Sequence, residues 1–85
     1  MGSELQVEVG RRIRARREAS GASQEEFARR TELARSFYGR IERGLQNVSL
    51  DTLARIAAAL PADLGDLLKG LPPEGFGAGA SKDAT

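Results

Sequence analysis

Cysteine and histidine are both absent from the 85 residues of this chain. Without cysteine there is no disulfide and no thiolate metal site. Without histidine the chain lacks the commonest general base and the usual nitrogen ligand of zinc. No pair of acidic residues stands in an apolar setting that would suit catalysis by carboxylates. These absences predict a protein that is not an enzyme and that uses no metal and no cofactor.

Long apolar runs are also missing. No stretch approaches the ~20 residues that a membrane-spanning helix needs, and the N-terminus lacks the pattern of a secretory signal. The expected location is therefore the cytoplasm, with no membrane partner. A chain of this length allows a single domain.

Charge is distributed unevenly behind the net value of +1. Residues 10–43 carry ten arginines and five glutamates, whereas residues 1–9 and residues 44–85 are each net acidic. A local positive field attracts phosphates whatever the average charge of the chain. This segment therefore suits nucleic acid, although arginine-rich helices also occur as ordinary solvated surfaces.

The spacing of apolar residues and the turn signals predict five helices followed by a tail rich in Gly, Ala and Ser. The expected helices lie near residues 4–19, 24–30, 35–43, 50–60 and 64–68. Residues 1–3 are expected to be disordered or a cloning remnant, and residues 4–71 to form one domain. Residues 72–85 are expected to be a disordered tail, because they cannot bury enough apolar surface to offset the entropy of ordering.

Helix boundaries are marked by capping residues. Ser23 and Glu26 have the spacing of a capping box, and Ser49 and Asp63 are suitable N-caps. Gly44 suits the position just past a helix end.

The helix expected before Gly44 has two dissimilar faces. Ala34, Tyr38 and Ile41 recur at steps of four and three residues, so they are expected to share one face. The opposite face is expected to carry Arg35, Ser36, Gly39, Arg40 and Arg43. A small apolar seam opposite an arginine-bearing face suits insertion into a DNA groove.

Motifs between residues 9 and 68 resemble the helix-turn-helix domain of phage repressors. The resemblance is carried by Gly10-Arg11-Arg12-Ile13, residues 21–28, Ile41-Glu42-Arg43-Gly44, residues 49–60 and Leu67-Leu68. It implies an all-α fold, a compact five-helix domain of the lambda-repressor type. Arg35-Ser36-Phe37 and residues 43–49 further resemble the small controller proteins of restriction-modification systems.

The resemblance implies that residues 35–43 form a recognition helix. Base contacts are then expected from Arg35, Ser36 and Arg40, since a guanidinium can donate two parallel hydrogen bonds to guanine O6 and N7. Contacts with the DNA backbone, which set register without reading sequence, are expected from Ser23, Gln24, Phe37, Arg43, Gln46 and Asn47. Alternatively, Arg40 is a solvated charge, Phe37 belongs to the core and Asn47 stabilises a turn.

The resemblance also implies a partly buried ion pair between Arg17 and Glu42 that orients the recognition helix. Two positions depart from the family pattern. Glu32 stands where a left-handed backbone is expected, which costs a glutamate roughly 1 kcal/mol. Ala34 stands at the N-cap without a side-chain acceptor, at a cost of about 1 kcal/mol, unless Thr31 helps to start the helix.

Domains of this kind usually act as two-fold dimers on palindromic sites. Double-stranded DNA and a second copy of the chain are therefore the expected partners, with RNA polymerase as a further contact. Leu64, Leu67, Leu68 and Leu71 offer more apolar surface than so small a core requires. They are the expected dimer interface, unless they only close the core.

The expected function is sequence-specific regulation of transcription at an operator, with a restriction-modification controller as one version. One alternative is an antitoxin that neutralises a toxin protein through residues 72–85 and autoregulates its operon. Another is a structural helical module that has no role with nucleic acid.

Overall fold

The computed structural model describes residues 3–76, and in this range the chain is helical, with no strand. The helices are α1 (Glu4–Ser20), α2 (Gln24–Thr31), α3 (Arg35–Glu42), α4 (Leu50–Ala59) and α5 (Leu64–Leu68). The predicted all-α class and the five helices are confirmed. Residues 1–2 and 77–85 lie outside the described residues, and with them most of the segment that the antitoxin alternative needs.

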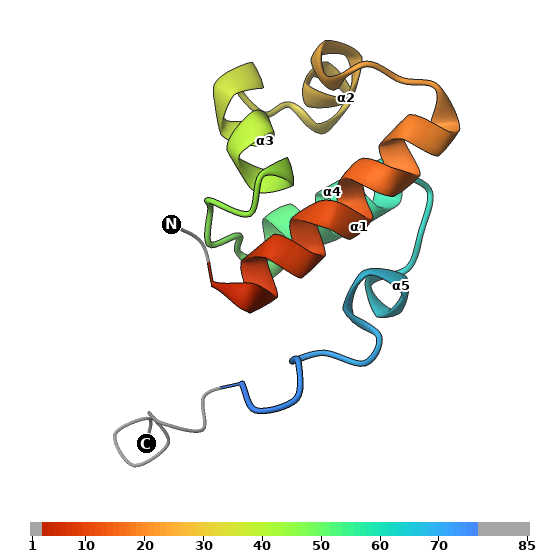
Figure 1. The fold of residues 1–85 in the computed structure, drawn as a ribbon. Helices are drawn as coiled ribbons and strands as arrows, with labels where there is room; N and C mark the ends of the chain where they lie inside the picture. Colours follow the sequence, from red (N-terminus) through yellow and green to blue (C-terminus); the bar gives the residue numbers. More distant parts are fainter. Residues whose placement is uncertain (1–2, 77–85) are drawn as a thin grey trace.

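The other four helices are arranged around α1, which is the longest (Figure 1). Helices α2 and α3 pack together, α3 contacts α1, and α2 contacts α4. Helix α5 packs against α1 and α4, away from α3 (Figure 1). This arrangement leaves the outer side of α3 uncovered by any other helix of the described chain.

Serine side chains cap three of the helix starts. Ser23 accepts a hydrogen bond from the backbone N–H of Glu26, as the capping box predicts, and Ser49 accepts one from Thr52. Ser3 caps α1 in the same way, with Gln6 completing a capping box. Ser3 belongs to the segment expected to be disordered or a cloning remnant, yet it has a place in the fold, because its hydroxyl satisfies a backbone N–H at the helix start.

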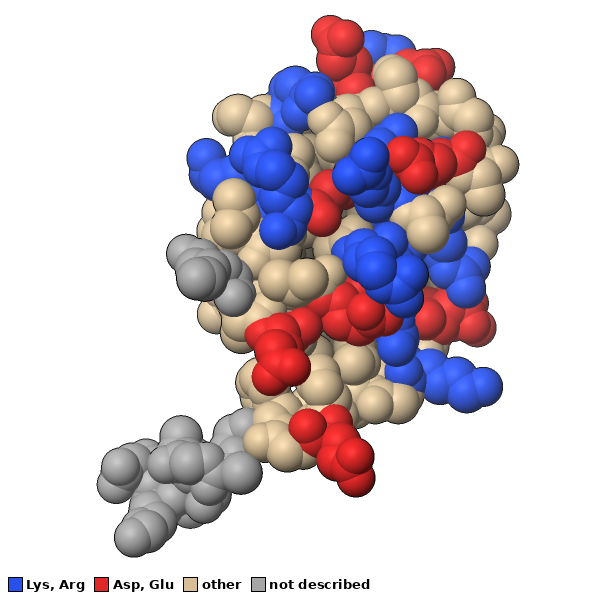
Figure 2. Space-filling view, in the orientation of Figure 1, with Lys and Arg blue, Asp and Glu red and all other residues tan. Residues whose placement is uncertain are grey.

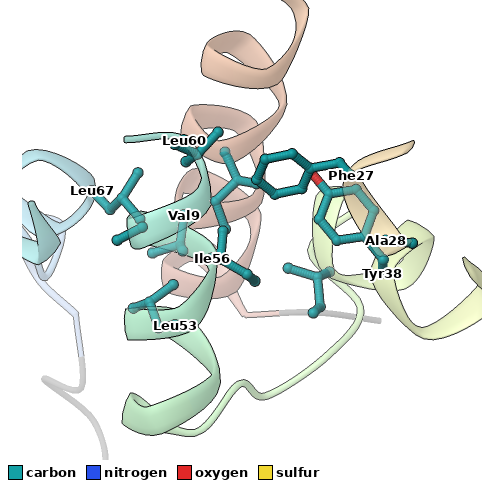
Figure 3. Packing of buried hydrophobic residues seen from close by; sticks show 11 residues of the cluster. Val9, Phe27, Ala28, Tyr38, Leu53, Ile56, Leu60 and Leu67 are labelled. Carbon is teal, nitrogen blue, oxygen red and sulfur yellow. The ribbon is translucent and has the colours of Figure 1, made fainter. Parts of the chain in front are cut away.

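The core joins side chains from all five helices (Figure 3). Phe27 and Tyr38 pack their rings against each other at 5.2 Å between centroids. The fully buried side chains also include Ile13, Ile41, Ile56 and Leu67. Ala34 was expected to share the buried face of Tyr38 and Ile41 but is exposed, because it stands before the first turn of α3 as its N-cap.

The C-terminal end of α3 lies against the backbone of α1. A Cβ atom placed on Gly10 would meet the carbonyl oxygen of Ile41 and lie only 2.8 Å from that of Glu42. Gly44 has φ 74°, and a Cβ atom placed on it would likewise collide with the backbone of Val7. The absence of side chains at these two glycines allows α3 to dock on α1 at this distance.

Candidate nucleic-acid interface

Helix α3 presents a basic surface to solvent. Arg35, Ser36 and Arg40 are exposed, as is Arg43 at the C-cap, whereas Tyr38 and Ile41 point into the core. Lys and Arg side chains gather over α3 and along the visible face of α1 (Figure 2). The structure therefore brings the three expected base-contacting residues together on one accessible helix face.

Arg40 is held in place by two neighbours on this surface. Its Nε donates to Oε1 of Gln46 at 3.2 Å, and its guanidinium carbon lies 6.0 Å from the centre of the Phe37 ring. Phe37 is half-buried and packs against the core. The interpretation of Phe37 as a core residue thus holds in part, because the side chain packs against the core but stays partly accessible. Its contact with the DNA backbone stays a prediction.

The start of α2 borders the α3 surface. The side chains of Ser23 and Glu26 form the capping box of α2. Gln24, expected to hold a phosphate, instead donates from Nε2 to Oε1 of Glu42 at 2.8 Å. An amide nitrogen carries two N–H groups, so one donor of Gln24 remains for a phosphate while the other joins α2 to α3.

Glu42 lies at the centre of a buried hydrogen-bond network. It accepts two hydrogen bonds from Arg17, at 2.6 and 3.1 Å, one from Gln24, and a short one from the Tyr38 hydroxyl. Arg17 also donates to the carbonyl oxygen of Ala22 at 2.9 Å. The predicted Arg17–Glu42 ion pair is therefore confirmed, and it is more deeply enclosed than expected.

The network shifts the pKa values of its members. Burial by itself raises the pKa of Glu42, but the hydrogen bonds from Arg17, Tyr38 and Gln24 together hold it below its usual value. Burial and the hydrogen bond to Glu42 raise the pKa of Tyr38. The role of Tyr38 was missed from the sequence, where it was assigned only to the apolar face. Its position four residues before Glu42, one helical turn away, was the available signal.

The turn between α2 and α3 is strained where the sequence predicts strain. Glu32 adopts a left-handed conformation with φ 59° and ψ 36°, and Ala34 makes no side-chain capping bond. Thr31 does not help to start α3, because its hydroxyl donates to the carbonyl oxygens of Phe27 and Ala28 in the preceding helix. The first turn of α3 therefore depends on tertiary contacts.

The loop after α3 carries the remaining residues that are expected to contact the DNA backbone. Gln46 is half-buried beside Arg40, and Asn47 is exposed. Together with Arg43, these residues continue the polar surface of α3 into the loop. No residue expected to contact DNA is buried away from this side of the molecule.

The leucines expected at a dimer interface are not equivalent. Leu67 has no exposed surface and packs in the core of its own chain, so its assignment to a dimer interface is wrong and the core-closing alternative holds for it. Leu64, Leu68 and Leu71 are half-buried. Arg12 fixes this region by donating to the carbonyl oxygens of Leu67 and Lys69, at 3.1 and 2.8 Å.

Within residues 3–76, none of the helices has the length and apolar character needed to cross a membrane. No three His, Cys, Asp or Glu residues in that range gather as potential metal ligands.

Comparison with known proteins gives the family. The model of a helix-turn-helix domain matches residues 8–70. The control protein C.MunI of Mycoplasma sp is 34% identical over 73 residues, which cover 85% of this chain and 99% of that protein. The crystal structure of the restriction-modification controller protein C.AhdI from Aeromonas hydrophila has a TM-score of 0.72 at 41% identity. It covers 74% of this chain and 96% of the controller.

A third relative has been solved with DNA. The structure of SinR, a master regulator for biofilm formation, in complex with DNA has a TM-score of 0.66 at 35% identity. It covers 69% of this chain and 95% of that one. These findings agree with the exposed arginines of α3, and the matched region includes α2 to α5 and most of α1. The chain belongs to the helix-turn-helix family and is a DNA-binding regulator of transcription.

Proposed function

We propose that the protein binds a palindromic operator as a homodimer, with α3 of each copy in the major groove. The observation that carries the proposal is the exposed face of α3, on which Arg35, Ser36 and Arg40 lie together. The major groove admits an α-helix and displays a distinct pattern of donors and acceptors for each base pair. These three residues are therefore the proposed base contacts.

The residues around this face are proposed to hold the DNA backbone. Ser23 and Gln24 lie at the start of α2, where backbone N–H groups and the helix dipole favour an anion. Phe37 lies in α3, Arg43 is its C-cap, and Gln46 and Asn47 lie in the loop that follows. Contacts of this kind orient the recognition helix on the duplex without reading its sequence.

The proposed dimer contact involves α5 and the start of α4. Leu64, Leu68 and Leu71 keep part of their surface accessible, and Leu50 is 71% exposed. An apolar pocket of about 260 Å³ lies beside Leu50 and is lined in part by Leu5, Leu53 and Leu68. A second copy would cover this apolar surface, which solvent otherwise contacts. Gln46 and Asn47 also line this pocket, so the proposed dimer contact borders the residues proposed to hold the DNA backbone. Arg35, Ser36 and Arg40 do not line it.

The similarity to C.MunI and C.AhdI supports a role as a restriction-modification controller. The resemblance covers nearly the full length of both proteins. Such a regulator acts where the chromosome is, in the cytoplasm, and alters transcription by occluding or contacting RNA polymerase. An adjacent pair of genes for a restriction endonuclease and a methyltransferase would support this assignment.

In-vitro selection from random DNA duplexes tests the proposal. We expect a palindromic motif with half-sites about one helical turn apart. Arg35→Ala should lose preference at one base pair in each half-site, whereas Lys69→Ala, which removes a positive charge far from α3, should keep the motif. Affinity measured against salt counts the phosphates contacted, at a slope of about −0.9 per phosphate.

Two results would contradict the proposal. The absence of any selected motif would exclude sequence-specific recognition. A motif bound by one copy per site, with a monomer seen by analytical ultracentrifugation at every accessible concentration, would exclude the dimer but not the role of α3.

A further inference from the structure

Gly39 lies on the outward face of α3 and yet is buried. No other helix covers this face. The atoms nearest to the position that a Cβ would occupy are Nη1 of Arg35, at 2.9 Å, and Nη1 of Arg43, at 3.4 Å. The two guanidinium groups therefore extend toward each other from one turn before and one turn after, and they cover the glycine.

This convergence depends on the missing side chain. A distance of 2.9 Å is shorter than a carbon and a nitrogen that are not bonded can approach without displacement. A methyl group at position 39 would therefore push the Arg35 guanidinium out of its present position. The helix backbone does not otherwise require glycine here, because Gly39 has no positive φ and glycine inside a helix is unfavourable relative to alanine.

Both guanidinium groups are available for a ligand. Within residues 3–76, the ion pairs involve Arg11, Arg12, Arg14 and Arg17, and neither Arg35 nor Arg43 takes part in one. Two neighbouring guanidinium groups on one helix face suit a group that presents several acceptors. In DNA such groups are the O6 and N7 edge of guanine and the adjoining phosphate.

We propose that Gly39 is a specificity-determining residue, because it permits Arg35 and Arg43 to converge into a single two-guanidinium site that reads guanine. Gly39 acts by positioning these side chains and makes no contact of its own with a base. The inference rests on the proposed function, since it requires that α3 enter the major groove. The inference adds Arg43 to the residues that read bases, whereas the sequence alone predicts only a contact between Arg43 and the DNA backbone.

The test uses Gly39→Ala and the matched control Gly65→Ala. Gly65 lies in α5, where an added Cβ meets nothing within 4 Å. Both variants should fold, with midpoints of thermal unfolding equal to or a few degrees above the parent's. Binding is measured to the selected operator and to an operator in which the guanine read by Arg35 is replaced.

Gly39→Ala should reduce the preference for the guanine operator by about tenfold, while affinity for unrelated DNA stays within about twofold. Gly65→Ala should keep the preference of the parent even though Gly65 lies in the proposed dimer helix, because a change in dimerisation alters the affinity for both operators alike. In the Arg35→Ala background, Gly39→Ala should have little further effect, because the residue that it positions is already absent. The same coupling is expected with Arg43→Ala.

The outcomes separate the two proposals. If the parent protein itself shows no base preference, the proposed function fails and the inference fails with it. If the parent discriminates and Gly39→Ala discriminates equally well, only the inference is overturned. A loss that persists undiminished in the Arg35→Ala background would also overturn it, since the added methyl group would then be obstructing the DNA itself.

Discussion

Arg17 and Glu42 join α1 to the last turn of α3 through two hydrogen bonds, from Nε at 2.6 Å and from Nη2 at 3.1 Å. The pair is buried, and Tyr38 and Gln24 satisfy the remaining acceptor positions of the carboxylate. A buried ion pair is weak evidence for net stability, because desolvation offsets the attraction. The pair instead fixes the position of α3 relative to α1, because its hydrogen bonds join the two helices.

Removal of one partner of this pair should be strongly destabilising. Glu42→Ala leaves the guanidinium of Arg17 buried without its carboxylate, a change that typically costs about 3–5 kcal/mol of unfolding free energy. Urea denaturation followed by circular dichroism measures the loss. Glu18→Ala, which breaks the exposed pair with Arg14, is the control and should cost less than about 1 kcal/mol. Equal losses in the two variants would show that burial of the pair has no energetic consequence.

Stability should fall in acid partly through Glu42. Hydrogen bonds hold the pKa of the folded-state carboxyl below its ordinary value of 4.5. Its contribution is therefore complete above pH 4.5 and is lost as the pH falls through the lower folded-state pKa. We expect the difference in unfolding free energy between the parent and Glu42→Gln to shrink between pH 5 and pH 3. A difference that stays constant over this range would contradict the shift.

Glycine at position 32 should stabilise the domain. Glu32 holds a left-handed backbone at φ 59°, which costs an L-residue about 1 kcal/mol and glycine very little. Glu32→Gly should therefore raise the thermal midpoint, whereas Glu32→Ala, which keeps a Cβ, should not. Calorimetry of both variants separates relief of strain from simple loss of the charge.

A serine at the start of α3 should also stabilise the domain. Ala34 has the extended backbone of an N-cap, with φ −60° and ψ 141°, but lacks an acceptor. Ala34→Ser supplies one and should add about 1 kcal/mol of unfolding free energy. Ala54→Ser, on the exposed side of α4, offers no cap and should be neutral or slightly unfavourable. A gain in both variants would point to a cause other than capping.

A side chain at position 10 should disrupt the docking of α3 on α1. The Cβ of Gly10→Ala meets the backbone carbonyls of Ile41 and Glu42, which cannot move independently of α3. A loss of about 1–3 kcal/mol is expected, as for other overpacked sites, with weaker DNA binding. Gly65→Ala, where the added Cβ meets nothing within 4 Å, should not lose stability. Unchanged stability of Gly10→Ala would mean that α1 and α3 separate easily.

Much of the local structure was predictable because it depends on neighbours within one or two turns. The caps at Ser23 and Ser49 and the glycine past the end of α3, Gly44, were predicted from local spacing, and the structure has them. The left-handed backbone at Glu32 was expected from the resemblance to the family, and the structure has it too. The Arg17–Glu42 pair came only from the resemblance to phage repressors. Nothing in local spacing links residues that lie 25 positions apart.

The sequence by itself determined the five helices and the exposure of the arginines of α3, because periodicity and capping are local properties. Only the tertiary structure decided that Leu67 belongs to the core, that Gln24 bonds to Glu42 and that Gly39 lies beneath two arginines. Burial and side-chain partners depend on which elements pack together in space. Arg12, for example, bonds to carbonyl oxygens 55 and 57 positions away.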